Sequence, residues 1–201
     1  YEIGVRLVGS EMCIRDRISE AELRFKKFLK NPNTLPADLQ ESVFSLVAWN
    51  GDESVHKKFL RLYKKANSQE EKLRFLAAMC SFKQKKLLLK TLEFTLGPDV
   101  RSQNIQMPIM RTTSNIYGRS FMWSWLKKNW KRIVSKAGIG NPLLNRVIAS
   151  IGQVVVSTQE KEVRKFFKEN PVRGTERTLE QTLERVRIHS KLLSSLKKEF
   201  S

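Results

Sequence analysis

Neither of the two histidines in this chain has the neighbours that a metal site needs. A helical zinc site of the H-E-x-x-H type places two imidazoles and a general base on one helical face. His56 is followed by Lys57 and Lys58, and His189 has no Cys or His nearby. We therefore expect both histidines to be surface or helix-capping residues, and we predict no metal site.

The other residues that could do chemistry are interpreted as structural residues. Cys80 lies on an apolar stripe with no base nearby, which indicates a packed thiol and not a nucleophile. Gly138 and Gly140 follow a predicted helix instead of a strand, so they indicate a helix end and not a phosphate loop. Glu70 and Glu71 fall in a first helical turn, where carboxylates complement the helix dipole. The sequence therefore predicts no catalytic residue in this chain.

The charge of the chain is strongly positive, at +18. No acidic residue lies between Asp99 and Glu160, and such a segment forms a positive surface if its basic side chains face one way. A solvated basic face without a function is the alternative, and the sequence leaves both open. The basic residues of this segment are Arg101, Arg111, Arg119, Lys127, Lys128, Lys131, Arg132, Lys136 and Arg146.

An aromatic run lies within the acid-free segment. Aromatic rings interleaved with cations can stack the bases of single-stranded nucleic acid. Helical spacing favours a different interpretation, with Trp123 and Trp130 in the core and the lysines outside. Phe121 and Trp125 then occupy a second face, which predicts contacts on two sides of the helix. The interleaved cations are Lys127, Lys128, Lys131 and Arg132.

The elements that would position these residues are helices throughout. From Ile18 onward, apolar residues recur at helical spacing between short polar turns, and only nine Gly and six Pro interrupt the chain. We predict an all-α fold of about nine or ten helices. A long helix is expected over Gly118–Ala137 and a buried helix over Pro142–Val156, with a strand at Val154–Val156 as the alternative.

Several helix ends carry capping signals. Asn50-Gly51 predicts a left-handed helix end, and Asp52 is placed to cap the next helix. Capping-box spacing is present at Ser68 with Glu71, Ser81 with Gln84, and Ser157 with Glu160.

The first 17 residues stand apart from this pattern. The chain begins with Tyr1 and not Met, so we expect a fragment. Residues 1–17, YEIGVRLVGSEMCIRDR, resemble the translated read-through of a sequencing-library adapter, and we expect the domain proper to be residues 18–201. A short strand at Ile3–Val8 is the alternative interpretation.

The cysteines and apolar stretches bear on where the protein resides. Cys13 and Cys80 are too far apart to form a disulfide scaffold, which favours a reducing compartment, and we expect the cytoplasm. No window reaches the roughly 18 consecutive apolar residues that a membrane span requires. The sequence therefore predicts no association with a membrane.

Several motifs, in order, carry a family resemblance. The stretch Tyr117–Trp130 is similar to a "G…W-x-F-x-x-x-N-W" signature, and Val100–Ile105 is similar to a preceding "V-R-x-Q-D-x". Leu35–Leu39, Glu162–Phe167 and Gln181–Glu184 resemble further helix motifs of the same family. Their order and spacing resemble the C-terminal domain of zinc aminopeptidases of the puromycin-sensitive or aminopeptidase N type.

The resemblance implies a HEAT-like α-α superhelix, which closes as a bowl over a separate thermolysin-like domain. That missing domain would hold the zinc and the catalytic residues, so this chain alone is expected to be inactive and to contain no cofactor. The parent enzyme would remove N-terminal residues from peptides. The implied partners are peptide substrates and, within the same protein, the catalytic domain; we do not expect nucleic acid.

The resemblance also implies a basic inner wall that attracts the C-terminal carboxylate of a peptide. The residues that we expect in this wall are Arg101, Arg111, Arg119, Lys127 and Lys128. In some relatives a basic residue occupies the position of Ser114, and Arg111 or Arg119 would replace it here. The alternative is a basic helical-repeat module that binds RNA or acts as a protein-interaction scaffold.

Overall fold

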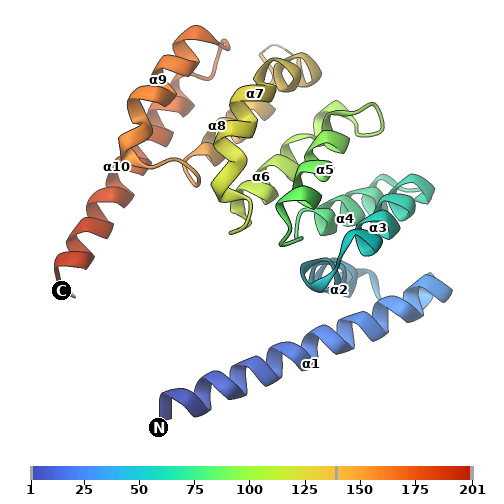
Figure 1. Cartoon of the computed structure of the whole chain (residues 1–201). Helices are drawn as coiled ribbons and strands as arrows, with labels where there is room; N and C mark the ends of the chain where they lie inside the picture. Colours follow the sequence, from blue (N-terminus) through green and yellow to red (C-terminus); the bar gives the residue numbers. More distant parts are fainter. Residues whose placement is uncertain (1, 139, 200–201) are drawn as a thin grey trace. The chain divides into compact units, whose positions relative to one another are not determined.

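The computed structural model describes the backbone of residues 2–138 and 140–199, and the side chains of residues 15–138, 140–192 and 194–196 (Figure 1). Within these residues it contains ten α-helices, three short 3₁₀ helices and no strand, which confirms the all-α prediction. The chain divides into two compact units, residues 1–91 and 92–201. Each unit is described by itself below.

The first unit consists of α1 (Glu2–Lys30), η1 (Pro32–Thr34), α2 (Ala37–Asn50), α3 (Glu53–Lys65), α4 (Gln69–Met79) and the first part of α5 (Lys85–Leu96). Helix α1 contacts α2, and both α2 and α3 contact α4. Because α1 begins at Glu2, the alternative of a strand at Ile3–Val8 is wrong. The side chains of residues 2–14 lie outside the described part, so the adapter-like leader remains an expectation.

Five phenylalanines from four helices form the core of the first unit. Their ring centroids lie between 5.0 and 6.5 Å from those of their neighbours. Aromatic rings at these separations gain more than their buried area alone supplies. The helical spacing of apolar residues therefore buries one stripe of each helix in a shared core. The rings belong to Phe25, Phe28, Phe44, Phe59 and Phe75.

Two of the predicted caps of this unit are confirmed. The Oδ1 atom of Asp52 accepts hydrogen bonds from the backbone N–H groups of Ser54 and Val55 at the start of α3. Ser68 and Glu71 form a reciprocal capping box at the start of α4, where each side chain accepts from the backbone N–H of the other residue. Both helices thus begin where side-chain oxygens satisfy free N–H groups.

The left-handed end predicted at Gly51 is wrong. Its φ is −82° and its backbone is extended. A Cβ at this position would lie 2.7 Å from the carbonyl oxygen of Val47 and 2.9 Å from Val55. Glycine is therefore required here by close packing between α2 and α3, and not by a left-handed conformation.

The capping box predicted at Ser81 and Gln84 is also wrong. Helix α5 begins at Lys85, so Gln84 lies just before the helix instead of in its first turn. The Gln84 amide donates a hydrogen bond to the carbonyl oxygen of Gly51, at 3.0 Å. A tertiary partner thus takes the side chain that the local pattern assigns to a cap.

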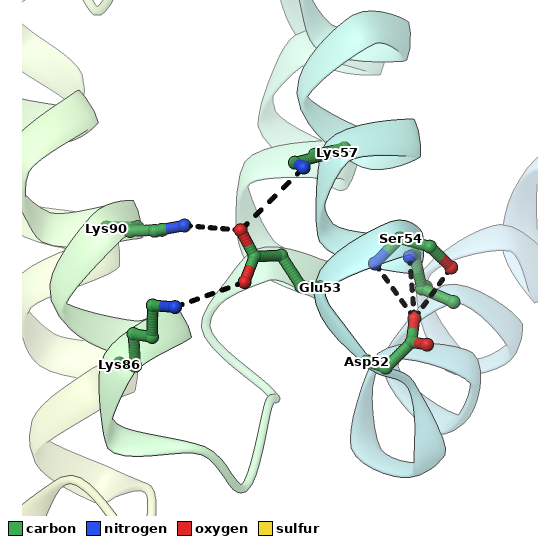
Figure 2. Close-up of polar contacts among 7 residues, drawn as sticks. Asp52, Glu53, Ser54, Lys57, Lys86 and Lys90 are labelled. Atoms are coloured by element: carbon green, nitrogen blue, oxygen red, sulfur yellow. Dashed lines mark hydrogen bonds and ion pairs between the residues drawn. The ribbon is translucent and has the colours of Figure 1, made fainter.

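The carboxylate of Glu53 joins α3 to α5 in the first unit (Figure 2). Its Oε1 atom lies 2.7 Å from Lys90 Nζ and 3.8 Å from Lys57 Nζ, and its Oε2 atom lies 3.3 Å from Lys86 Nζ. The hydrogen bonds from Lys90 and Lys86 lower the pKa of Glu53 to about 2. This carboxylate therefore stays ionised and paired at neutral pH.

His56 is buried, so its expected place at the surface or in a cap is wrong. Its Nε2 atom lies 2.9 Å from Thr91 Oγ1, and its ring packs 5.3 Å from the ring of Phe82. Burial, assisted by the charge of Lys90, lowers the pKa of His56 to about 4. The imidazole is therefore neutral at pH 7. Cys80 is buried and forms no disulfide with another described residue, as expected for a packed thiol.

The second unit contains the end of α5 and the rest of the chain. Its elements are η2 (Ser102–Asn104), α6 (Gln106–Ser114), α7 (Arg119–Ala137), α8 (Leu143–Ile151), η3 (Ser157–Gln159), α9 (Glu160–Glu169) and α10 (Glu176–Glu199). Helix α8 contacts α6, α7 and α10, so it is the centre of this unit. Within the described residues of the whole chain, no helix is both long and apolar enough to cross a bilayer.

Helix α7 is buried on two faces, as its sequence predicts. Trp123 and Trp130 pack edge-on against Phe166 and Phe167 of α9, with centroid distances of 5.5 Å for Trp123–Phe166 and 5.1 Å for Trp130–Phe167. Trp125 is buried as well, at 7% exposure. The interpretation of Trp123 and Trp130 as core residues is confirmed.

Two predictions for the second unit are wrong. The expected helix Pro142–Val156 is shorter, because α8 ends at Ile151 and a turn follows; the alternative strand at Val154–Val156 does not form either. The box at Ser157 and Glu160 is absent, because α9 begins at Glu160 after a 3₁₀ turn. The side chain of Gln159 instead accepts from the backbone N–H of Val156 at 3.1 Å.

Candidate functional site

The five basic residues expected in a peptide-binding wall all lie in the second unit. Arg101 precedes η2 and Arg111 lies in α6, whereas Arg119, Lys127 and Lys128 lie in α7. Lys128 follows Arg119 by nine residues, which places the two on opposite sides of the helix, about 180° apart. Helical geometry therefore does not direct all five toward one place.

Lys127 is already engaged by neighbours in its own unit. Its ammonium group pairs with the Glu162 carboxylate and lies 5.2 Å from the ring centroid of Trp123. The hydrogen bond from Lys127 lowers the pKa of Glu162. Lys127 thus connects α7 to α9, and this role uses the charge that a ligand would need.

Arg119 lines a groove that has a volume of about 430 Å³. The groove is formed by the start of α7, the end of α8 with the turn that follows it, and α10. Its apolar wall is Ala149, Val155, Val156 and Val186, and its polar wall is Arg119, Gln153, Arg185, His189 and Ser190. The other four expected wall residues do not line this groove.

Local structure places the cations of the groove. Arg185 and His189 are one turn apart on α10, so they project from the same face of that helix. Arg119 is the first residue of α7 and follows Gly118. A Cβ on Gly118 would lie 2.0 Å from the Thr112 carbonyl oxygen, so glycine permits the close turn that brings Arg119 to the groove.

The two arginines of the groove are exposed, and neither has an ion-pair partner among the described residues. Arg187, only two residues after Arg185, has its Nε atom 3.1 Å from Glu160 Oε2. Arg164 is likewise paired with both Glu160 and Glu180. Glu160 and Glu180 thus neutralise arginines outside the groove, and no lining residue is acidic.

Ser114 contacts this groove through Gln153. The Ser114 hydroxyl donates a hydrogen bond of 2.9 Å to Gln153 Oε1, so the amide N–H groups of Gln153 remain as donors. The family resemblance implies that some relatives have a basic residue at the position of Ser114. Arg119, five residues later, supplies a cation to the wall that Ser114 supports, whereas Arg111 does not line it.

Sequence reasoning missed Arg185 and His189 as candidates. Their one-turn spacing on a predicted helix was the available signal. Basic and acidic residues alternate along this helix, however, and spacing alone does not show that Glu160 pairs with Arg187 and leaves Arg185 without a partner. That pairing depends on the packing of η3, which directly precedes α9, against α10.

A stacking platform for nucleic acid is not available on α7. Phe121, Trp123, Trp125 and Trp130 are each no more than 7% exposed. Arg132, one of the interleaved cations, pairs with Glu93 at 2.9 Å. The buried rings cannot stack on bases, so this observation opposes the RNA-binding alternative.

The described residues contain no group of three or more His, Cys, Asp or Glu side chains that could hold a metal ion. His56 is enclosed by Phe82 and Thr91, and His189 lies in the groove beside Arg185. The side chains described here therefore do not fit a zinc site.

Comparison with known proteins gives the family. The sequence model of the ERAP1-like C-terminal domain matches residues 6–188. This chain belongs to the ERAP1-like C-terminal domain family. The ERAP1-like domain described here is helical, as the resemblance implies, and the predicted relationship to the C-terminal domain of M1-family aminopeptidases is confirmed.

Named relatives of this ERAP1-like domain are aminopeptidases. It is 32% identical to aminopeptidase M1-D of Oryza sativa subsp. japonica, over 97% of this chain and 23% of the relative. It is 31% identical to aminopeptidase M1 of Arabidopsis thaliana, over 92% of this chain and 21% of the relative. It is 28% identical to glutamyl aminopeptidase of Mus musculus, over 88% and 19%. The chain thus spans about a fifth of the length of these curated relatives.

Proposed function

We propose that this chain is the C-terminal domain of a zinc aminopeptidase that removes N-terminal residues from peptides. The domain bounds the substrate chamber and contacts a thermolysin-like catalytic domain of the same protein. Zinc belongs to that other domain in this proposal, because the residues described here do not fit it. Family membership and the aminopeptidase relatives support this assignment.

The basic groove is the part of the domain that binds the C-terminal carboxylate of the peptide. The single observation that carries this role is Arg119, an exposed arginine without an acidic partner in a groove that lacks acidic lining residues. A guanidinium binds a carboxylate through two parallel N–H···O bonds. Arg101, Arg111 and Lys128 remain candidates for other parts of the wall, outside this groove.

The proposal includes the compartment and the domain limits. Cys80 is buried and forms no disulfide with another described residue, which supports a reducing compartment such as the cytoplasm. The domain proper is residues 18–201, with residues 1–17 as an artefactual leader; the sequence of the intact gene across this junction tests both points. An aminopeptidase gene must encode H-E-x-x-H upstream of Ile18.

Peptide binding to the 201-residue chain tests the role of the groove. We expect Arg119→Met to weaken the binding of a fluorescent peptide about tenfold, the loss of one charge-assisted hydrogen-bonded pair. Replacing the peptide's carboxylate by an amide should weaken binding to the wild-type chain similarly, and should have no further effect on the variant. Fluorescence anisotropy measures all four combinations.

The matched control is Arg177→Met. Arg177 is exposed on α10, as Arg185 is, but does not line the groove. Equal losses for Arg119→Met and Arg177→Met would show that only the net charge attracts the peptide, and the proposed role of the groove would then be wrong.

A further inference from the structure

The groove contains more positive charge than one carboxylate can neutralise. Arg119 and Arg185 each bring a guanidinium group, and no acidic residue lines the groove. A peptide terminus brings a single negative charge. One guanidinium would therefore remain without a counter-charge after the terminus binds.

The polar groups around the arginines include hydrogen-bond donors. The Ser114 hydroxyl donates to the oxygen of the Gln153 side chain, so the N–H groups of Gln153 remain as donors. The Ser190 hydroxyl and the His189 ring also line this wall. Carboxylates are acceptors only, so the wall suits a ligand with more than one of them.

The apolar wall faces the same space. Val155 and Val186 are buried, whereas Val156 is 56% exposed at the groove. These side chains offer contact to the methylene groups of an acidic residue, while its carboxylate reaches a guanidinium. The groove volume of about 430 Å³ lies in the range of sites that hold small ligands.

We infer that the groove selects peptides that carry an acidic side chain at their C-terminal residue, so that two carboxylates bind together. Arg119 binds the terminal carboxylate, and Arg185 binds the acidic side chain, with Gln153 and His189 as neighbouring polar groups. This inference rests on the proposed function of the groove. It adds a substrate class, namely peptides that end in Glu or Asp.

Four peptides of one length test the inference with the 201-residue chain. The first has a neutral last residue and a free carboxylate, the second is its C-terminal amide, the third ends in Glu, and the fourth has Glu in the middle. We expect the third to bind about tenfold more tightly than the first, because a second charge-assisted pair forms. The fourth should bind nearly as weakly as the first.

Variants of the chain show which arginine binds which carboxylate. Arg185→Met should abolish the difference between the first and third peptides and should leave the difference between the first and second unchanged. Arg177→Met, on the same helix, should alter neither. Circular dichroism verifies that each variant is folded, and Arg185→Lys retains a charge if Arg185→Met does not fold.

The outcomes separate the inference from the proposed function. If the first and third peptides bind equally while the amide binds more weakly, the inference is wrong and the proposed function stands. If the fourth binds as tightly as the third, attraction is general and the inference is again wrong. If the first peptide and its amide bind equally, the proposed function fails, and the inference fails with it.

Discussion

The His56 imidazole connects α3 to α5 through a hydrogen bond that depends on its tautomer. The Thr91 hydroxyl has one hydrogen, which it donates to the backbone oxygen of Met79 or Leu87, at 3.1 and 3.0 Å. Its oxygen therefore accepts from the Nε2–H of neutral His56, at 2.9 Å. A proton added to the ring would place a charge among buried side chains.

This environment predicts that acid destabilises the first unit. Burial lowers the pKa of His56 to about 4 in the folded protein, from the ordinary value of 6.5 that applies in the unfolded chain. The unfolded chain therefore binds more protons, and the free energy of unfolding falls as the pH decreases from 6.5 to 4. The loss should total roughly 3 kcal/mol. Urea denaturation at a series of pH values measures it.

His56→Gln is the informative variant, since it removes the titration and retains a hydrogen-bonding side chain. Its free energy of unfolding should change little over this pH range, while exposed His189→Gln should follow the wild type. Glu53 affects stability in the adjoining, lower pH range. Its contribution to the free energy of unfolding is present above pH 4.5 and is lost as the pH falls toward 2. Parallel curves for His56→Gln and the wild type would contradict the assignment of a buried neutral histidine.

The local sequence could not place His56. Its neighbours are Lys57 and Lys58, which favour a surface position. The partners that bury it are Phe82 and Thr91, the latter 35 residues away. By contrast, Cys80 lies within an apolar stripe, and its burial could be predicted.

At the scale of single elements, caps decide where the helices begin. Ser68→Ala removes the acceptor for the Glu71 backbone N–H at the start of α4. We expect the first unit to lose about 1 kcal/mol of stability. Thermal or urea unfolding measures this loss.

Ser42→Ala is the control for the serine change, because Ser42 lies exposed within α2 of the same unit. Alanine has the higher helix propensity, so this variant should be neutral or slightly more stable. If both variants lost equal stability, the effect would not come from the cap.

Capping boxes show how far local patterns reach. Three boxes share the same spacing in the sequence, but only the one at Ser68 and Glu71 forms among them. At the predicted box of Ser81 and Gln84, the Gln84 amide donates to the Gly51 carbonyl instead. At the predicted box of Ser157 and Glu160, a 3₁₀ turn precedes α9. Spacing identifies candidates, and contacts from distant residues select among them.

The turn between α6 and α7 gives a further prediction. Gly118→Ala would place a methyl group 2.0 Å from the Thr112 carbonyl oxygen. We expect a loss of about 1–3 kcal/mol from the second unit, because backbone must move. Weaker peptide binding should accompany it, since Arg119 follows directly. Denaturation followed by the fluorescence of Trp123, Trp125 and Trp130 measures the stability.

Gly138→Ala separates this steric effect from backbone strain. Gly138 has a φ of +90°, and no atom lies within 4 Å of the position that a Cβ would take. The cost of this substitution is therefore only that of holding an alanine at φ +90° and ψ 140°, a conformation that glycine alone adopts readily, about 1–3 kcal/mol. If Gly138→Ala lowered the free energy of unfolding more than Gly118→Ala does, the contact between the new methyl group and the Thr112 carbonyl would be removed by only a small movement of the backbone.

At the scale of the whole molecule, the helix count and the all-α class could be predicted from periodicity alone. The groove could not, because its walls come from three helices and from a turn at Gly152–Val156 that the sequence suggested was helix. The HEAT-like superhelix remains a prediction that follows from the family.

The division of labour in the proposed enzyme gives a prediction for the isolated chain. It should show no peptidase activity and no stoichiometric zinc binding, because its described side chains form no metal cluster. A chelator should leave its melting temperature unchanged, since no folding energy comes from a metal. Chelator-resistant zinc in the purified chain, or peptide cleavage by it, would contradict this division.

Three lysines share the single carboxylate of Glu53, two of them from α5 and one from α3 itself. The ionic part of the connection between these helices is therefore redundant on the lysine side, whereas on the other side it depends on Glu53. Acetylation or loss of either Lys86 or Lys90 leaves the other in place to hold α3 against α5. We therefore expect related sequences to replace Lys86 or Lys90 singly without losing the ion pair. Replacement of Glu53 would remove all three ion pairs at once.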